Sequence, residues 1–318
     1  MRIKGQMDTD NGTAERPWVL APHQVAAYLA RIGYDGDCQP TPQTLQALQR
    51  AHLLNVPFDN LDIMAARPLV CDLGGLYDKI VGQRRGGICY ELNSLFAALL
   101  RSLGFTVEIY SARIPGELYN QDFDHLLLGV PLAGQLWLAD TGFGRGSFLE
   151  PILLQPGLAQ EDARGSFRIA RIETATKPDS ATDADVRQPT AAATDTDSRQ
   201  PEAATTDAQA GTWPAYQLYW QPPGGEPSLS YSFTTQPRAL AEFVPRWTHF
   251  ATAPDSRFRS NSLVAKDTPD GRISLTSDRL LITAGGQQQR IEIADEAAYC
   301  SALSEHFGIT WPDGELPA

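Results

Sequence analysis

The sequence has few cysteines and no paired ones. Its 318 residues include only Cys38, Cys71, Cys89 and Cys300, which are widely spaced and form no C-x-x-C motif. This spacing argues against a zinc site and against a disulfide framework, so no metal is expected. Each cysteine is therefore either a small buried hydrophobic residue or a reactive thiol.

Basic residues and long apolar runs are also scarce. Lys and Arg number 26 against 38 Asp and Glu, which gives a net charge of −12 and argues against a nucleic-acid partner. No apolar run approaches the roughly 18–20 residues that span a bilayer. The first residues, MRIKGQMDTDNG, lack the apolar core of a signal peptide. We expect a cytoplasmic protein without a membrane partner, which still leaves room for a small phosphate-bearing ligand.

The hydrophobic spacing changes along the chain from a helical period to a period of two. Helices are predicted over 22–32, from the capping pair Thr41-Pro42 onward, and from Cys89 to just before Gly104. Asp295 is a predicted cap for a final helix that runs to His306. Helices followed by strands predict α+β units in series. The strands are predicted over 106–111, 124–130, 135–140, 216–220, 229–233, 262–266, 272–276, 280–283 and 290–293.

One segment, about 174–211, has no aromatic residue and consists mainly of Ala, Thr, Asp, Pro, Ser and Gln. Such a composition cannot bury enough apolar surface to offset the entropy of ordering the chain. We predict a mobile surface insertion without a catalytic role.

A cysteine follows two glycines at the start of a predicted helix, in the segment Arg84-Arg85-Gly86-Gly87-Ile88-Cys89. A thiol at a helix N-terminus lies at the positive end of the helix dipole, which favours the thiolate. The alternative is that Cys89 is a core residue and that the glycines merely form a turn. Both interpretations fit this segment alone.

A nucleophilic cysteine needs a base and a group that orients the base. A hairpin turn centred between Leu132 and Ala133 would place His125 directly opposite Asp140, with Cβ atoms about 5 Å apart. This pairing favours the catalytic interpretation of Cys89. For each residue alone, a structural role in the sheet or at a strand end is the alternative.

The other histidines have no comparable acidic partner in the sequence. His52 lies on a predicted helix, His249 lies in a segment predicted to be irregular, and His306 closes the final helix, where its charge is stabilising. We assign these three a structural role.

A glycine-rich segment, Thr141-Gly142-Phe143-Gly144-Arg145-Gly146, follows Asp140. Gly142 and Gly144 allow the backbone to approach a ligand closely, and Phe143 offers a flat wall to an aromatic substrate. A flexible loop at a strand end is the alternative.

Together these motifs resemble the arylamine N-acetyltransferases. The resemblance is carried by Arg-Gly-Gly-x-Cys at 85–89, Glu-Leu-Asn at 91–93, His125 on a strand, and Asp-x-Gly-Phe-Gly at 140–144. Residues 55–61 are similar to the family's N-x-P-F-E-N-L, with Asp59 in place of the usual Glu. Residues 252–258 are a looser match to S-T-x-P-x-S-x-F. The resemblance spans roughly residues 17–309, apart from the insertion.

The resemblance implies an α+β fold with a cysteine-protease-like Cys-His-Asp arrangement. The implied units are an N-terminal helical domain at 1–105, a central antiparallel β-barrel at 106–235 and a C-terminal α/β lid at 236–318. The implied triad is Cys89, His125 and Asp140, with Arg85, Asp59 and Asn93 supporting the site through contacts that include an Arg85–Asp59 ion pair. Acetyl-coenzyme A is the implied donor, an arylamine or hydrazine is the implied acceptor, and Phe143 matches a position that lines the acceptor pocket.

Three other functions use some of the same residues. An amide synthase would join a carrier-bound or polyketide acyl thioester to an aryl amine. A papain- or transglutaminase-like hydrolase would act on peptide amides. A non-catalytic scaffold would carry a degenerate site, although all three triad residues are present.

Overall fold

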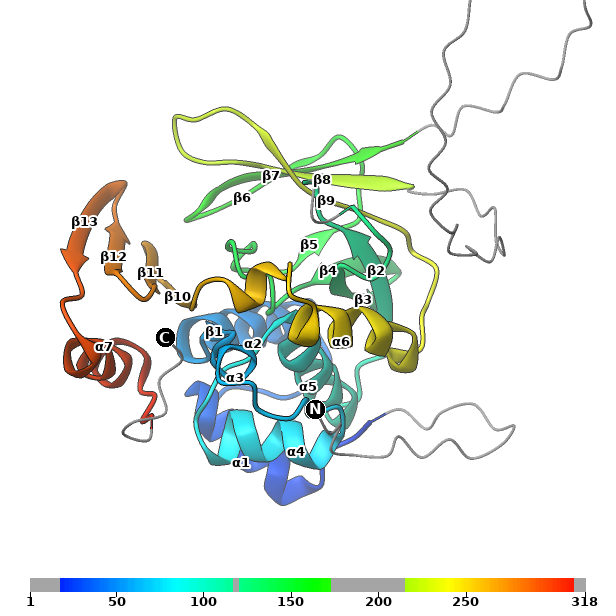
Figure 1. Ribbon diagram of the computed structural model, residues 1–318. Coiled ribbons are helices and arrows are strands. Elements are labelled where there is room, and N and C mark those ends of the chain that lie inside the picture. Colours follow the sequence, from blue (N-terminus) through cyan, green and yellow to red (C-terminus); the bar gives the residue numbers. More distant parts are fainter. Residues whose placement is uncertain (1–17, 117–119, 173–214, 312–318) are drawn as a thin grey trace, which may run out of the picture.

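The computed structural model describes residues 18–116, 120–172 and 215–311 (Figure 1). The insertion predicted at 174–211 lies outside the described residues. Within the described ranges, no helix is both long enough and apolar enough to cross a membrane.

The N-terminal part is helical, as predicted. Thr41 caps the second helix by accepting a hydrogen bond from the Thr44 N–H, and Pro42 occupies the first turn. The fifth helix is buried from Cys89 to Leu100, so it forms the centre of the helical core. The five helices are α1 (Pro22–Ile32), α2 (Pro42–Asn55), α3 (Leu61–Met64), α4 (Leu73–Tyr77) and α5 (Cys89–Ser102).

An eight-stranded antiparallel sheet curls into a nearly closed barrel. The spatial order is β5-β4-β3-β2-β9-β8-β7-β6, so β5 and β6 are the edge strands. The Gln160 side chain bridges these edges, because it bonds both the N–H and the carbonyl of Leu153. The strands are β2 (Glu108–Arg113), β3 (His125–Leu132), β4 (Gln135–Ala139), β5 (Ile152–Leu153), β6 (Ala159–Asp162), β7 (Gly165–Arg171), β8 (Tyr216–Gln221) and β9 (Ser228–Phe233). The prediction of an α+β fold with an antiparallel barrel is confirmed.

The β3–β4 hairpin differs from its predicted register. Leu132 pairs with Gln135 and Leu128 with Ala139, so the turn residues are Ala133 and Gly134. Both have positive φ, 52° and 75°, which is the backbone that tight two-residue hairpins favour. The prediction that His125 lies directly opposite Asp140 is therefore wrong. The register is displaced by two residues, which keeps both side chains on the same face of the sheet.

A second sheet of five strands lies to one side of the helices with the final helix (Figure 1). Its first strand comes from the N-terminal part of the chain, since Phe58 pairs with Ala265. The predicted turn at Pro269-Asp270 is present, because Thr268 pairs with Gly271. The elements are β1 (Phe58–Asp59), β10 (Val264–Thr268), β11 (Gly271–Leu275), β12 (Arg279–Ala284), β13 (Gln287–Glu292) and α7 (Glu296–Ala302).

The sequence analysis missed the short helices α3 and α4, and also one longer helix. His249 lies within α6 (Val244–Thr252), so the expectation of an irregular segment there is wrong. Trp247, Phe250 and Ala251 have helical spacing and are buried against the helical core, and Pro245 occupies the first turn, where it is compatible with a helix.

Candidate active site

Cys89 is the first residue of α5 and is 4% exposed. The turn before it is held by Glu91, whose carboxylate accepts a hydrogen bond from the Ile88 N–H at 2.9 Å. This hydrogen bond from the backbone before the helix to a side chain in its first turn fixes the direction in which the helix begins, and therefore where the thiol points.

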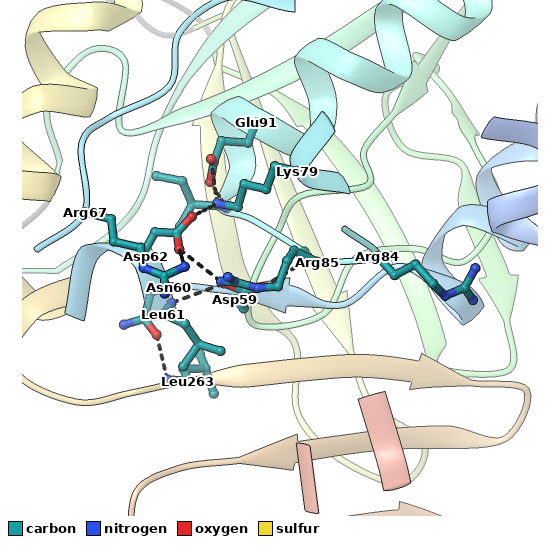
Figure 2. Close-up of polar contacts among 12 residues, drawn as sticks. Asp59, Asn60, Leu61, Asp62, Arg67, Lys79, Arg84, Arg85, Glu91 and Leu263 are labelled. Atoms are coloured by element: carbon teal, nitrogen blue, oxygen red, sulfur yellow. Dashed lines mark hydrogen bonds and ion pairs between the residues drawn. The ribbon is translucent and has the colours of Figure 1, made fainter. Parts of the chain in front are cut away.

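A buried ion network lies behind this turn (Figure 2). Arg85 bonds Asp59 at 3.3 Å and Asp62 at 3.2 Å, and the Asp59 carboxylate also accepts the Gly86 N–H at 2.9 Å. The expected Arg85–Asp59 contact is therefore present despite the shorter side chain. Its effect is to tie the residues before Cys89 to β1.

The same network contains residues that the sequence analysis did not identify. Lys79 bonds Asp62 at 2.8 Å and Glu91 at 2.7 Å, as Figure 2 shows. Burial raises the pKa of Asp62, but the charges of Lys79 and Arg85 outweigh it and lower the pKa to about 2. Lys79 belongs to no recognisable sequence motif, so only its contacts in the folded protein identify it as a member of this network.

His125 and Asp140 form a buried pair. His125 Nε2 lies 2.8 Å from an Asp140 carboxylate oxygen, although the two residues are not directly opposite in register. Burial lowers the pKa of His125, but the Asp140 charge and hydrogen bond, together with a hydrogen bond to Cys89, outweigh it and raise the pKa to about 10. The imidazole is therefore protonated at neutral pH and bonds both the acid and the thiol.

Asn93 connects α5 to the strand ends. Its side-chain N–H group donates to Asp140 at 3.0 Å and to the Leu126 carbonyl at 2.7 Å, and its oxygen accepts the Thr141 N–H at 2.8 Å. These bonds hold α5, which carries Cys89, at a fixed position relative to Asp140, the partner of His125.

Two further residues complete the surroundings of Asp140 and were not predicted. Tyr231 on β9 donates its hydroxyl to Asp140 at 3.2 Å, and the Gln49 side chain on α2 accepts the Asp140 N–H at 3.0 Å. Both lie 91 residues away in sequence and carry no motif, so nothing in the sequence pointed to them.

The glycine-rich loop after Asp140 passes directly over Cys89. A Cβ at Gly142 would lie 2.6 Å from the Cys89 Cα, so the backbones can approach only with glycine there. The ring of Phe143 lies 5.3 Å from the His125 ring and 5.2 Å from the Tyr231 ring, between centroids. Phe143 is thereby held next to the histidine.

These side chains meet in a cavity of about 240 Å³. Cys89, His125 and the loop from Gly142 to Gly144 line it, and its apolar wall includes Phe58 and Phe258. Arg85, Asp59 and Asn93 are buried behind it. All of the predicted site residues thus lie in the cavity wall or directly behind it, and the cavity can take a small aromatic molecule.

The fold and this cluster define an α+β protein with a buried cysteine, histidine and aspartate at one cavity. A family model described as N-acetyltransferase matches residues 41–314. The arylamine N-acetyltransferase of Mycolicibacterium smegmatis is 32% identical over 298 residues, which cover 91% of this chain and 93% of that protein. The chain therefore belongs to the arylamine N-acetyltransferase family.

Two other relatives extend the comparison. The pineal gland isozyme of arylamine N-acetyltransferase from Gallus gallus is 31% identical, over 90% of this chain and 94% of its own. The structure of Mycobacterium marinum arylamine N-acetyltransferase in complex with coenzyme A superposes with a TM-score of 0.73 at 26% identity, covering 92% and 97% of the two chains. The predicted family and enzyme class are confirmed, whereas the roles of individual residues stay predictions.

Proposed function

We propose that the protein transfers an acetyl group from acetyl-coenzyme A to an aromatic amine or hydrazine, through an acetyl-cysteine on Cys89. Membership in the family supports the reaction class. The observation that carries the assignment is the placement of Cys89 at the start of α5, where it lines one cavity together with His125.

In the first half-reaction the Cys89 thiolate attacks the thioester carbonyl, and a new carbon–sulfur bond forms as coenzyme A leaves. His125 gives its proton to the departing coenzyme A sulfur. Backbone N–H groups at the start of α5 stabilise the developing oxyanion. Asp140 keeps the imidazole oriented and its positive charge compensated.

In the second half-reaction the amine attacks the acetyl carbonyl and releases the Cys89 sulfur. His125, left neutral by the first step, accepts the proton that the amine loses as the amide forms. An aromatic amine suits this step because its neutral form dominates at pH 7 and attacks directly. Phe143 serves as the acceptor wall, with the backbone of Gly142 and Gly144 beside it, while Arg85, Asp59 and Asn93 hold the cysteine and the acid in place.

We also propose the division into a helical domain (1–105), a barrel domain (106–235) and an α/β lid (236–318) in a cysteine-protease-like arrangement. Separate clusters of buried hydrophobic residues inside the barrel and around α7 support it. A cytoplasmic location agrees with the four free cysteines.

The test is intact-protein mass after brief exposure to acetyl-coenzyme A, with Cys89→Ala as the control. We expect a gain of one acetyl group in the wild type, none in the variant, and loss of the adduct when p-anisidine is added. An adduct that forms equally on Cys89→Ala would overturn the assignment of Cys89 as the nucleophile. Absence of an adduct on a wild-type protein whose Cys89 is still readily alkylated would overturn acetyl-coenzyme A as donor and favour the amide synthase.

A further inference from the structure

The loop that carries Phe143 rests on two arginines from distant parts of the chain. A Cβ at Gly146 would lie 2.0 Å from Arg164 Nη2 and 3.2 Å from Arg272 Nη1. Gly146 has a φ of 102°, so only glycine fits both the backbone angle and the space that the guanidinium groups leave. The loop is therefore packed directly against this pair.

Arg272 on β11 also holds the loop by a hydrogen bond. Its Nη2 donates to the carbonyl of Gly144 at 2.5 Å, and its Nη1 donates to Asp267 at 2.9 Å. Gly144 is the next residue after Phe143, so this contact fixes the backbone that carries the aromatic ring.

Asp267 on β10 organises both arginines. Its carboxylate bonds Arg164 as well as Arg272, and its side chain is 3% exposed. Charge-assisted hydrogen bonds at such burial are strong and directional. Arg164 also has a fixed backbone, because its carbonyl accepts the indole N–H of Trp220 on β8 at 3.0 Å. The cluster thus joins the C-terminal sheet, the barrel and the loop.

We propose that Asp267 and Arg272 are positioning residues that set acceptor specificity, by fixing the wall of the cavity that Phe143 forms. This inference rests on the proposed function, since it concerns the acceptor of that reaction. Within the described residues, the contacts of this pair reach the loop at Gly144 and Gly146 but do not include Cys89, His125 or Asp140. The pair reaches the site at the Phe143 end of the loop, so its effect on the second half-reaction should exceed its effect on the first.

The experiment separates the two half-reactions in Arg272→Met and Asp267→Asn. Arg290→Met is the matched control, because Arg290 belongs to the same sheet but lies on β13, paired with Glu292. Acetylation of Cys89 by acetyl-coenzyme A is followed by mass. Transfer to p-anisidine and to unsubstituted aniline is then measured separately, to give KM and kcat for each acceptor.

For both test variants we expect an acetylation rate within twofold of wild type and an acceptor KM raised at least fivefold. We also expect the ratio of kcat/KM for p-anisidine and aniline to change at least threefold, while Arg290→Met matches wild type. A general loss of folding would instead lower kcat/KM for both acceptors and the acetylation rate together, without changing the acceptor ratio.

An unchanged acceptor KM and an unchanged acceptor ratio in a folded Asp267→Asn would overturn the inference, and so would a defect confined to Cys89 acetylation. Asp267→Asn keeps the shape of the side chain, so it serves if Arg272→Met does not fold. A wild-type protein that acetylates Cys89 but transfers to no arylamine is a different result, because it overturns the proposed function before any variant is made.

Discussion

Asp140 is completely buried, and its carboxylate accepts hydrogen bonds from Asn93, Gly142, His125 and Tyr231. A buried carboxylate is tolerated only when its oxygens are bonded and its charge is compensated. His125 compensates the charge, and the other three donors fix the plane of the carboxylate. The orientation of His125 is thus determined by residues from α5, from the loop and from β9.

A second histidine, His52, is also buried, but its imidazole is neutral, unlike that of His125. Its Nδ1 lies 2.9 Å from the Tyr28 hydroxyl and its ring packs edge-on to Phe96. Burial, together with the nearby charge of Arg31, lowers the pKa of His52 to about 3. His52 is therefore a neutral core residue, which agrees with the structural role assigned from its helix position.

This lowered pKa of His52 predicts that the unfolding free energy of the protein falls as the pH is lowered. Below pH 6.5 the unfolded chain protonates His52 while the folded protein does not, so stability is present above pH 6.5 and is lost as the pH falls toward 3. At pH 5 the loss attributable to His52 is about 2 kcal/mol. Urea unfolding of wild type and His52→Gln at pH 7 and pH 5 measures it, and we expect a smaller loss in the variant.

The control for this experiment is His23→Gln, which replaces an exposed histidine on α1. It should lose as much stability between the two pH values as wild type. Equal losses in wild type and His52→Gln would show that His52 does not supply the acid sensitivity.

At the scale of elements, the loop from Thr141 to Gly146 brings Phe143 close to Cys89, and the backbone at Gly142 is too close to α5 to admit a side chain. Gly142→Ala introduces a Cβ 2.6 Å from a backbone atom of α5, which cannot rotate away. We expect a loss of about 1–3 kcal/mol in unfolding free energy. The acetylation rate of Cys89 should also fall at least tenfold, measured by mass after mixing with acetyl-coenzyme A.

Gly82→Ala is the matched control for this loop variant. A Cβ at Gly82 meets nothing within 4 Å, so both stability and rate should match wild type. A Gly142→Ala protein with wild-type kinetics would mean that the loop moves freely relative to Cys89.

Elements whose boundaries have local causes were predictable. The cap at Thr41, the turn at Pro269-Asp270 and the helix start at Cys89 all follow from neighbouring residues. The hairpin register was not, because Ala133 adopts a positive φ that alanine seldom takes. The contact between His125 and Asp140 forms nevertheless, because an error of two residues in register leaves both side chains on the same face.

At the scale of the whole molecule, the contacts that complete the site join segments far apart in sequence. Asp140 meets Tyr231 across 91 residues, and Gly144 meets Arg272 across 128. Such pairs depend on how the barrel, the helices and the C-terminal sheet pack together, which no local pattern records. For this reason the motif residues were predictable, with Arg85, Asp59 and Asn93 among them, whereas Gln49, Tyr231 and Arg272 were not.

A buried ion pair joins the helix α6 to the barrel. Arg246 bonds Asp124 at 2.6 Å, and Asp124 immediately precedes His125 and also accepts the Gln121 N–H at 2.8 Å. Arg246→Met leaves this carboxylate buried without its cation, so we expect a loss of about 3–5 kcal/mol in unfolding free energy, measured by urea denaturation. Arg290→Met, which removes an exposed pair with Glu292, should change stability by less than about 1 kcal/mol.

The double variant Asp124→Asn with Arg246→Met separates charge from packing. If the cost of the single variant comes from an uncompensated charge, removing the carboxylate as well should restore part of the stability, so the double variant should be more stable than Arg246→Met alone. If it is no more stable, the cost comes instead from lost packing of the Arg246 side chain over the Phe250 ring, 4.4 Å away. Restoration would identify the ion pair as the link that holds α6 against the strand that begins with His125.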